Sequence, residues 1–157
     1  MMGLKHISTE NYPYFVTTTV SNSLKKFETK ENAQILQDVL YFGREKGWYL
    51  LLSFVIMADH LHLILVPKNK DISPIMKSIK GYSSRRINEN LNRKGSLWQK
   101  NFYDYILDTE EKLTTKVRYI EANPVRRGLV SKAEDYKFSS AYFDNADDLK
   151  AYIGGSY

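Results

Sequence analysis

An apolar run followed at once by a second, shorter one constrains the fold most: "WYLLLSFVIMADHLHLILVP" at 48–67. Neither run is long enough to span a bilayer. An apolar run of this length is typical of a strand that is buried on both faces. "ADH" leaves room for only a tight turn, and Pro67 ends the second run. We therefore predict that residues 48–57 and 61–67 form an antiparallel hairpin inside a sheet.

Two amphipathic helices are predicted, one on each side of this hairpin in the chain. The first has its apolar stripe at 33–40, and the second keeps helical spacing from Ile75 to Leu91. Both have capping signals and a glycine stop: Thr29 and Gly47 for the helix over 30–46, and Ser73, Pro74 and Gly95 for the helix after the hairpin.

The remaining elements complete a recognisable order. Residues 11–20 and 101–107 are rich in β-branched and aromatic side chains and predict strands. Asp108 and Glu111 resemble a capping box for a third helix, which Pro124 would end near Asn123. A short helix is expected near 146–152. The first six elements match the split βαβ, or ferredoxin-like, arrangement: an α+β fold with an antiparallel sheet, two helices on one face and an added helix.

Length and composition fit one domain over residues 1–157. The chain has no cysteine, which excludes disulfides, thiolate metal sites and cysteine nucleophiles. "MMGLKHISTE" lacks the apolar core of a secretory signal, so a cytoplasmic protein with no membrane partner is expected. The net charge of +5 favours a polyanionic partner such as nucleic acid.

Positive charge is concentrated in residues 77–100. Seven Lys and Arg side chains stand there against one acid, Glu89. They are Lys77, Lys80, Arg85, Arg86, Arg93, Lys94 and Lys100. This segment is a nucleic-acid-binding candidate, and a solvated basic face is the alternative. Bases of a single strand could stack on the aromatic residues that follow. We expect Trp98 or Tyr103 to be a packing residue instead.

His60 and His62 are the first candidates for chemistry. Residues i and i+2 of a strand share a face, so both imidazoles could converge on one divalent ion. Leu61 and Leu63 would then point into the helices, and the histidines to the other face. Two half-exposed histidines beside a turn are the alternative, because H-x-H is a short motif.

The third helix carries a second group of candidates. With Leu113, Val117 and Ile120 as the buried stripe, Tyr119 falls off the stripe, on one flank with Lys112, Thr115 and Asn123. A surface tyrosine is the alternative. A neutral phenol is a poor nucleophile, so the chemistry would need a bound cation to polarise a phosphodiester and a lysine, Lys112 or Lys116, to favour phenolate. Attack by Tyr119 would give a covalent phosphotyrosine.

Three blocks, "VIMADHLHLILVP", "GSLWQKNFYDYIL" and "YIEANPVRRGLV", resemble the REP-associated tyrosine transposases, single-tyrosine HUH proteins related to single-strand insertion-sequence transposases. The resemblance covers residues 55–130. It implies a ferredoxin-like fold, His60 and His62 as metal ligands with Asn123 as the third, and Tyr119 as the nucleophile.

The resemblance further implies Mg²⁺ or Mn²⁺ as the ion and single-stranded DNA, bearing a hairpin, as the substrate. DNA would be nicked and rejoined through a 5′-phosphotyrosine, and Arg126 and Arg127 could hold phosphates beside the scissile bond. The family's usual Asn or Glu before the first histidine is Asp59 here, and its usual proline is Ala58. A domesticated module that binds without cleaving, and a purely structural ion, remain open. So do a monomer and a homodimer, in which the tyrosine could serve the partner's histidines.

Overall fold

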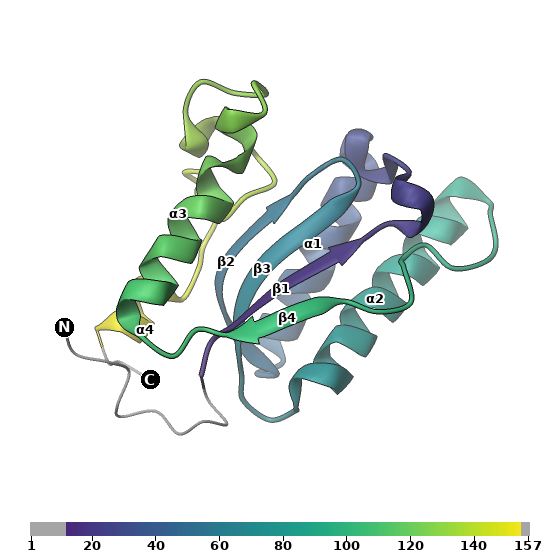
Figure 1. Ribbon diagram of the computed structural model, residues 1–157. Coiled ribbons are helices and arrows are strands. Elements are labelled where there is room, and N and C mark those ends of the chain that lie inside the picture. The colour runs from purple at the N-terminus through teal and green to yellow at the C-terminus, as the bar shows by residue number, and fades with distance from the viewer. Residues whose placement is uncertain (1–11, 155–157) are drawn as a thin grey trace.

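The structure is a computed structural model that describes residues 12–154. Its centre is a four-stranded antiparallel sheet in the order β2-β3-β1-β4 (Figure 1). The strands are β1 (Tyr14–Thr19), β2 (Tyr49–Ile56), β3 (His60–Pro67) and β4 (Tyr103–Ile106), and the helices are α1 (Lys30–Glu45), α2 (Ile72–Leu91), α3 (Glu110–Arg126) and α4 (Leu149–Ile153). The predicted α+β class and element order are confirmed.

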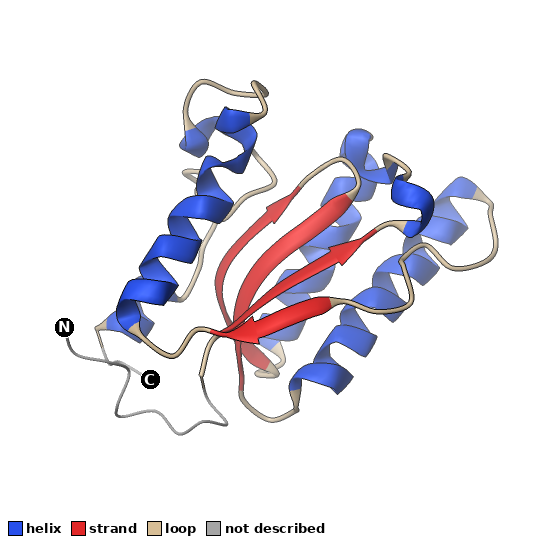
Figure 2. Cartoon of the chain, in the orientation of Figure 1, coloured by secondary structure: helices blue, strands red, loops and turns tan. Residues whose placement is uncertain are grey.

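The sheet separates two apolar layers. Helices α1 and α2 cover one face, while α3 crosses the other face near β2 (Figures 1 and 2). Alternation along β3 divides its side chains accordingly: Leu61 and Leu63 pack with α1 and α2, and Ile64 packs with α3. On the α3 side of the sheet, α3 lies over β2 and β3, and no helix of residues 12–154 lies over β4 (Figure 2).

Several predicted helix ends are wrong by a few residues. Helix α2 begins at Ile72 with Asp71 as its N-cap residue, so Ser73 and Pro74 lie inside the first turn. It ends at Leu91, because Asn92 at the C-cap has a φ of 51° and breaks the helix before Gly95 is reached. Asparagine tolerates this left-handed conformation better than most residues. Asn92 was thus a possible helix end, and the sequence prediction overlooked it in favour of Gly95.

Helix α3 also differs at both ends. The N-cap residue is Thr109, whose hydroxyl accepts a hydrogen bond from the Lys112 backbone N–H at 3.1 Å, and not Asp108. Pro124 lies inside the helix, which continues to Arg126. A proline so near a helix end loses one backbone bond, and the Leu129 N–H still bonds to the Pro124 carbonyl.

The strand and terminal predictions need smaller adjustments. β1 and β4 are shorter than expected, and residue 11 of the predicted first strand lies outside the described residues. Sequence patterns missed three short 3₁₀ turns, η2 (Ser21–Ser23), η3 (Lys26–Glu28) and η4 (Ala133–Asp135). The expected C-terminal helix is present as α4. In the described part of the chain, no helix is both long and apolar enough to cross a membrane.

The segment from 136 to 148 runs along the free edge of β2. Backbone bonds join Ile56 to Phe138, Phe54 to Ser140 and Leu51 to Asp148. The buried Asp148 carboxylate also accepts from the Leu51 N–H and forms a bidentate pair with Arg44 at 2.8 and 2.9 Å. The tail thus ties the region after α3 to α1 and β2.

Replacing Asp148 with alanine is expected to lower the free energy of unfolding by about 3 to 5 kcal/mol. The change leaves the Arg44 guanidinium without its bidentate partner and a β2 edge N–H without its acceptor. Chemical denaturation measures the difference, and the exposed Asp144→Ala change should cost less than about 0.5 kcal/mol. Equal stability of the two variants would contradict the role given to Asp148.

Candidate functional site

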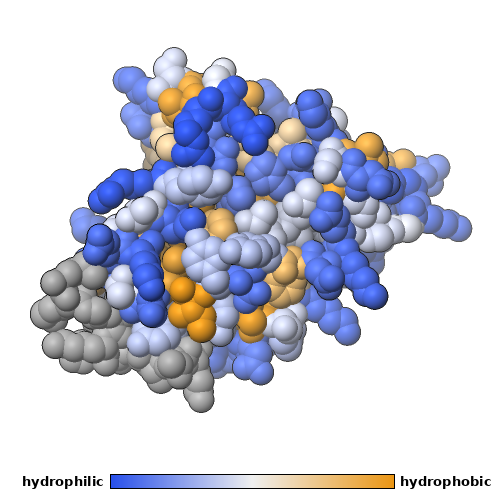
Figure 3. All heavy atoms as spheres, in the orientation of Figure 1, coloured by the Kyte–Doolittle hydropathy of each residue, from blue (hydrophilic) through white to orange (hydrophobic). Residues whose placement is uncertain are grey.

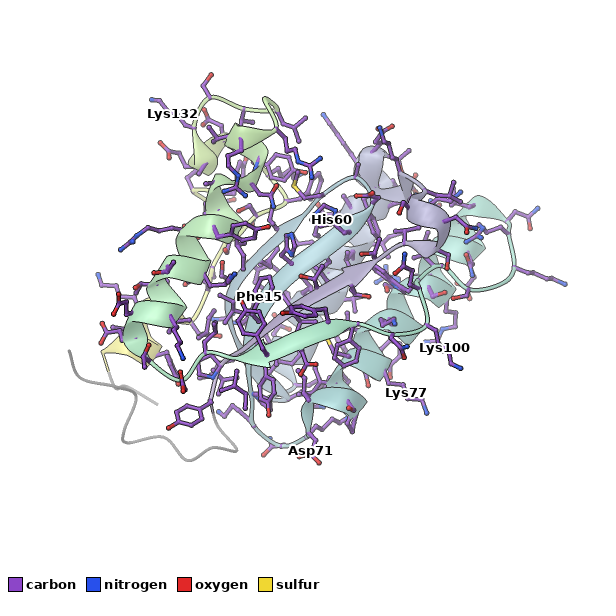
Figure 4. The ribbon with its side chains drawn as sticks, viewed as in Figure 1. Phe15, His60, Asp71, Lys77, Lys100 and Lys132 are labelled. Atoms are coloured by element: carbon purple, nitrogen blue, oxygen red, sulfur yellow. The ribbon has the colours of Figure 1, made fainter. Side chains whose placement is uncertain are left out.

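His60 and His62 lie side by side on the open face of the sheet, opposite α1 and α2. Their ring centroids are 4.7 Å apart. His62 is 8% exposed and stacks on Phe15 of β1, with ring centroids 5.5 Å apart. Figure 4 shows His60 on the sheet face that looks toward α3. The prediction that His60 and His62 share one face of their strand is therefore confirmed.

Each histidine has one ring nitrogen held by a neighbour. His60 Nδ1 lies 2.7 Å from the Asp59 carboxylate, which must accept the bond, so this nitrogen carries the proton. His62 Nδ1 lies 2.8 Å from the Thr17 hydroxyl. Where both Nδ1 atoms donate, both Nε2 atoms keep a free lone pair. Such outer hydrogen bonds orient imidazoles that bind metals.

Burial lowers the pKa of His62 from 6.5 to about 4. Desolvation is the largest cause, and the neighbouring positive groups His60, Lys116, Arg126 and Arg127 add to it. His62 is therefore neutral at physiological pH, the protonation state that a metal ligand needs.

The low pKa of His62 predicts that the metal-free protein loses stability in mild acid. Between pH 6.5 and about 4 the unfolded chain protonates this histidine and the folded chain does not. Stability from this group is complete above pH 6.5 and falls as pH drops, by at most about 3 kcal/mol. Denaturant titrations in chelator should show this slope in the wild type and a shallower one in His62→Gln. Parallel slopes would contradict the burial effect.

Tyr119 lies next to the histidine pair in the same chain. Its ring centroid is 5.7 Å from that of His62 and 6.5 Å from that of Phe15. The side chain is 41% exposed, whereas the stripe of Leu113, Val117 and Ile120 is buried as expected. Strands β1 and β3 and helix α3 thus bring a phenol and two imidazoles together.

Two cations contact the Tyr119 ring. Lys116 Nζ and Arg126 Cζ each lie 4.7 Å from its centroid. Lys116 Nζ also lies 4.6 Å from the Phe15 centroid and 5.3 Å from that of Tyr105. Three aromatic rings therefore hold the ammonium group of Lys116 beside the phenol, where it can attract a phosphate.

The flank expected for α3 is only partly correct. Lys112 bonds to Asp108 at 2.7 Å, whereas Lys116 lies over the Tyr119 ring, so Lys116 is the lysine beside Tyr119. Asn123 is 4% exposed and belongs to the buried face, one turn after Tyr119. The Asn123 side chain is therefore more buried than a side chain on the flank of α3 would be.

The basic candidates fall into two groups. Arg126 lies over the Tyr119 ring, and the charges of Arg126 and Arg127 both help to lower the pKa of His62. The rest lie on or just after α2, behind the sheet: Lys77, Lys80, Arg85, Arg86, Arg93, Lys94 and Lys100. Figure 4 places Lys77 and Lys100 toward the β4 side of the molecule, away from His60.

Some of these side chains have structural partners. Lys80 Nζ donates to the carbonyls of Gln99 and Lys100, and burial lowers its pKa. Arg93 bonds to Asn88, and Arg85 lies over the Tyr82 ring. Arg86 lines a hollow with acidic residues of α1. The basic segment therefore does not converge on the histidines.

Four residues that the sequence interpretation did not assign to the site are part of it. Asp59 and Thr17 hold the histidine rings, and Phe15 and Tyr105 hold Lys116. The alternation in "YFVTTT" places Phe15 and Thr17 on one face, but only the strand register shows which β3 residue each one meets.

The residues present suit a divalent ion that accepts nitrogen and oxygen donors. Within residues 12–154 no three His, Cys, Asp or Glu side chains cluster as a complete metal site. His60 and His62 offer two imidazole donors side by side, and a third donor would have to come from an amide such as Asn123 on the buried face of α3. Imidazole with carbonyl oxygen is compatible with Mn²⁺ or Mg²⁺.

Comparisons with known proteins agree on one family. The family model described as "Transposase IS200 like" matches residues 9–123. A REP-associated tyrosine transposase of Escherichia coli (strain K12) is 23% identical over 138 residues, which cover 87% of this chain and 80% of that protein.

Two further matches are also named as REP-associated tyrosine transposases. A Haemophilus influenzae protein named as a REP-associated tyrosine transposase is 27% identical over 103 residues, 59% of this chain and 58% of that protein. The chain thus spans less than two thirds of that relative. The structure of a REP-associated tyrosine transposase bound to a REP hairpin superposes with a TM-score of 0.68 at 23% identity, covering 83% of this chain and 76% of that one. This likeness shows the fold.

Proposed function

The chain belongs to the IS200-like transposase family, and on that premise we propose that it nicks and rejoins single-stranded DNA through a 5′-phosphotyrosine at Tyr119. The observation that carries the proposal is the placement of the Tyr119 ring 5.7 Å from the His62 ring within one chain. The related structure holds a REP hairpin, so a hairpin-bearing single strand is the substrate class proposed here. We propose that the protein acts on this DNA in the cytoplasm.

In the proposed reaction Tyr119 Oη attacks the scissile phosphorus. The new bond joins Oη to phosphorus, the bond from phosphorus to the 3′ oxygen breaks, and the 3′ oxygen leaves as a hydroxyl with a proton. The phenol proton passes to solvent or to a basic group at the site. Attack by the freed or another 3′ hydroxyl reverses these steps and rejoins the strand.

His60, His62 and Asn123 would hold the divalent ion, which supplies a positive charge for the phosphate oxygens when bound. Asp59 and Thr17 keep the two rings oriented through their Nδ1 atoms. Lys116 and Arg126, both in contact with the Tyr119 ring, would attract the negatively charged strand to the phenol. Arg127 would contact a neighbouring phosphate.

The short separation within one chain supports cis catalysis. Tyr119 lies on α3, and residues 136–148 fix the chain beyond α3 to β2 through backbone bonds. Ser140 also contacts Glu121 of α3 at 3.2 Å. A monomer therefore contains every proposed group, and exchange of α3 with a partner would require these contacts to break.

The test is a reaction of the protein with a hairpin-bearing single-stranded oligonucleotide in Mn²⁺. We expect a covalent protein–DNA species that resists denaturation and disappears when the ion is chelated. Tight hairpin binding with no adduct in any divalent ion would instead show a binding module of the same family.

A further inference from the structure

The face of β4 beside the proposed active centre contains two tyrosines that the reaction does not use. Tyr103 is 62% exposed, and its ring centroid lies 5.6 Å from that of Tyr105. Of the two residues of which one was expected to pack, Trp98 is the packing residue, 3% exposed and bonded to the Ser83 hydroxyl, whereas Tyr103 is exposed. Most of the Tyr103 side chain is therefore open to a ligand.

Strand register places Tyr103 in line with the histidine pair. Thr17 of β1 pairs with Tyr103 on one side and with His62 on the other. All three side chains point to the same face, and adjacent strands are about 4.8 Å apart. The strand position of Tyr103 is therefore roughly 10 Å from that of His62, with Thr17 between them.

A hollow connects the tyrosines to the centre. It measures about 330 Å³, and its lining includes Tyr103, Tyr105, His62, Lys116 and Tyr119. Figure 3 shows pale and orange atoms gathered at the centre of this face, framed by blue ones. The hollow is shallow and open, which suits a flat group laid on rings more than an enclosed small molecule.

A cation lies within this aromatic strip, because Lys116 stands between Tyr105 and Tyr119. A cation beside exposed rings is the arrangement that single-stranded nucleic acids need, with phosphates on the cation and bases on the rings.

We propose that Tyr103, supported by Tyr105, is a stacking platform for a nucleobase of the strand that flanks the scissile phosphate. This deepens the proposed function and rests on it for the ligand class, single-stranded DNA. The platform binds a base through its face, so it orients the strand without reading a particular sequence. Tyr103 is thus a positioning residue for the strand, and Lys116 attracts a neighbouring phosphate.

The test measures binding without cleavage, in the Tyr119→Phe background and without divalent ions. Fluorescence anisotropy compares a thymidine oligonucleotide with an abasic oligonucleotide of the same length and charge. Tyr103→Ala should weaken binding of the thymidine strand by about five- to 150-fold and leave the abasic strand unchanged. Tyr103→Phe should keep most of the affinity, because it keeps the ring.

Phe143→Ala is the matched control, because Phe143 is 77% exposed and its ring contacts Tyr142 outside the site. It should change neither affinity, and all variants should melt together. An equal loss for both oligonucleotides, no loss with Tyr103→Ala, or no saturable binding of thymidine to the parent protein would each overturn the platform. None of these results depends on adduct formation, so failure of the nicking reaction is recognised separately.

Discussion

Tyr119→Phe is expected to abolish the covalent protein–DNA species, with the rate of strand cleavage falling by at least about a thousandfold. Only the hydroxyl is removed, so the ring keeps its contacts with His62, Phe15, Lys116 and Arg126. No other group replaces an absent nucleophile, and the remaining site leaves only residual catalysis. The measurement is denaturing electrophoresis of end-labelled hairpin DNA after reaction in Mn²⁺.

Binding controls separate loss of chemistry from loss of fold. Tyr119→Phe should bind the hairpin oligonucleotide within about twofold of the wild type and should melt at the same temperature, because the side chain is partly exposed and keeps its ring. Tyr105→Phe is a matched loss of a phenol hydroxyl on the same face, and it should still form the adduct. Adduct formation by Tyr119→Phe would assign the nucleophile elsewhere.

Loss of the imidazoles is expected to have the second largest effect. His60→Ala and His62→Ala should each lower Mn²⁺-supported cleavage by at least about a hundredfold, because each removes a proposed ligand. Thr17→Val removes only the partner of His62 Nδ1 and should weaken Mn²⁺ affinity by about 10- to 100-fold. Isothermal titration with the metal alone gives the affinities without any DNA reaction.

A structural ion predicts a different pattern. If the ion held the fold together, chelator would lower the melting temperature of the wild type as strongly as His60→Ala does. The sheet and both apolar layers are complete without the histidines, so we expect chelator to change the melting temperature little and cleavage greatly. A large shared fall in melting temperature would contradict a catalytic ion.

Local patterns predicted much of this fold. The apolar runs at 48–67 gave the central hairpin, and alternation placed His60 and His62 on the face opposite Leu61 and Leu63. Period-3.6 spacing gave the buried stripe of α3. These features depend on neighbours within one strand or helix, which sequence spacing describes directly.

Features that depend on contacts between elements were not predictable in the same way. The pairing of Thr17 with both His62 and Tyr103 depends on sheet register, and a slip of one residue would turn Thr17 to the other face. The choice of Lys116 over Lys112 depends on how α3 crosses the sheet. Ser73 lies two residues after Asp71, and Asp108 lies next to Thr109. All four residue types favour the N-cap position, so residue type alone did not identify the N-cap of either helix.

Peptide mapping of the trapped adduct tests the central claim most directly. After reaction with hairpin DNA in Mn²⁺, nuclease and protease digestion leave a short nucleotide on one peptide, which fragmentation by mass spectrometry can locate. We predict a nucleotide joined through its 5′ phosphate to Tyr119. A nucleotide on another residue, or a 3′ linkage, would contradict the proposed chemistry of this site.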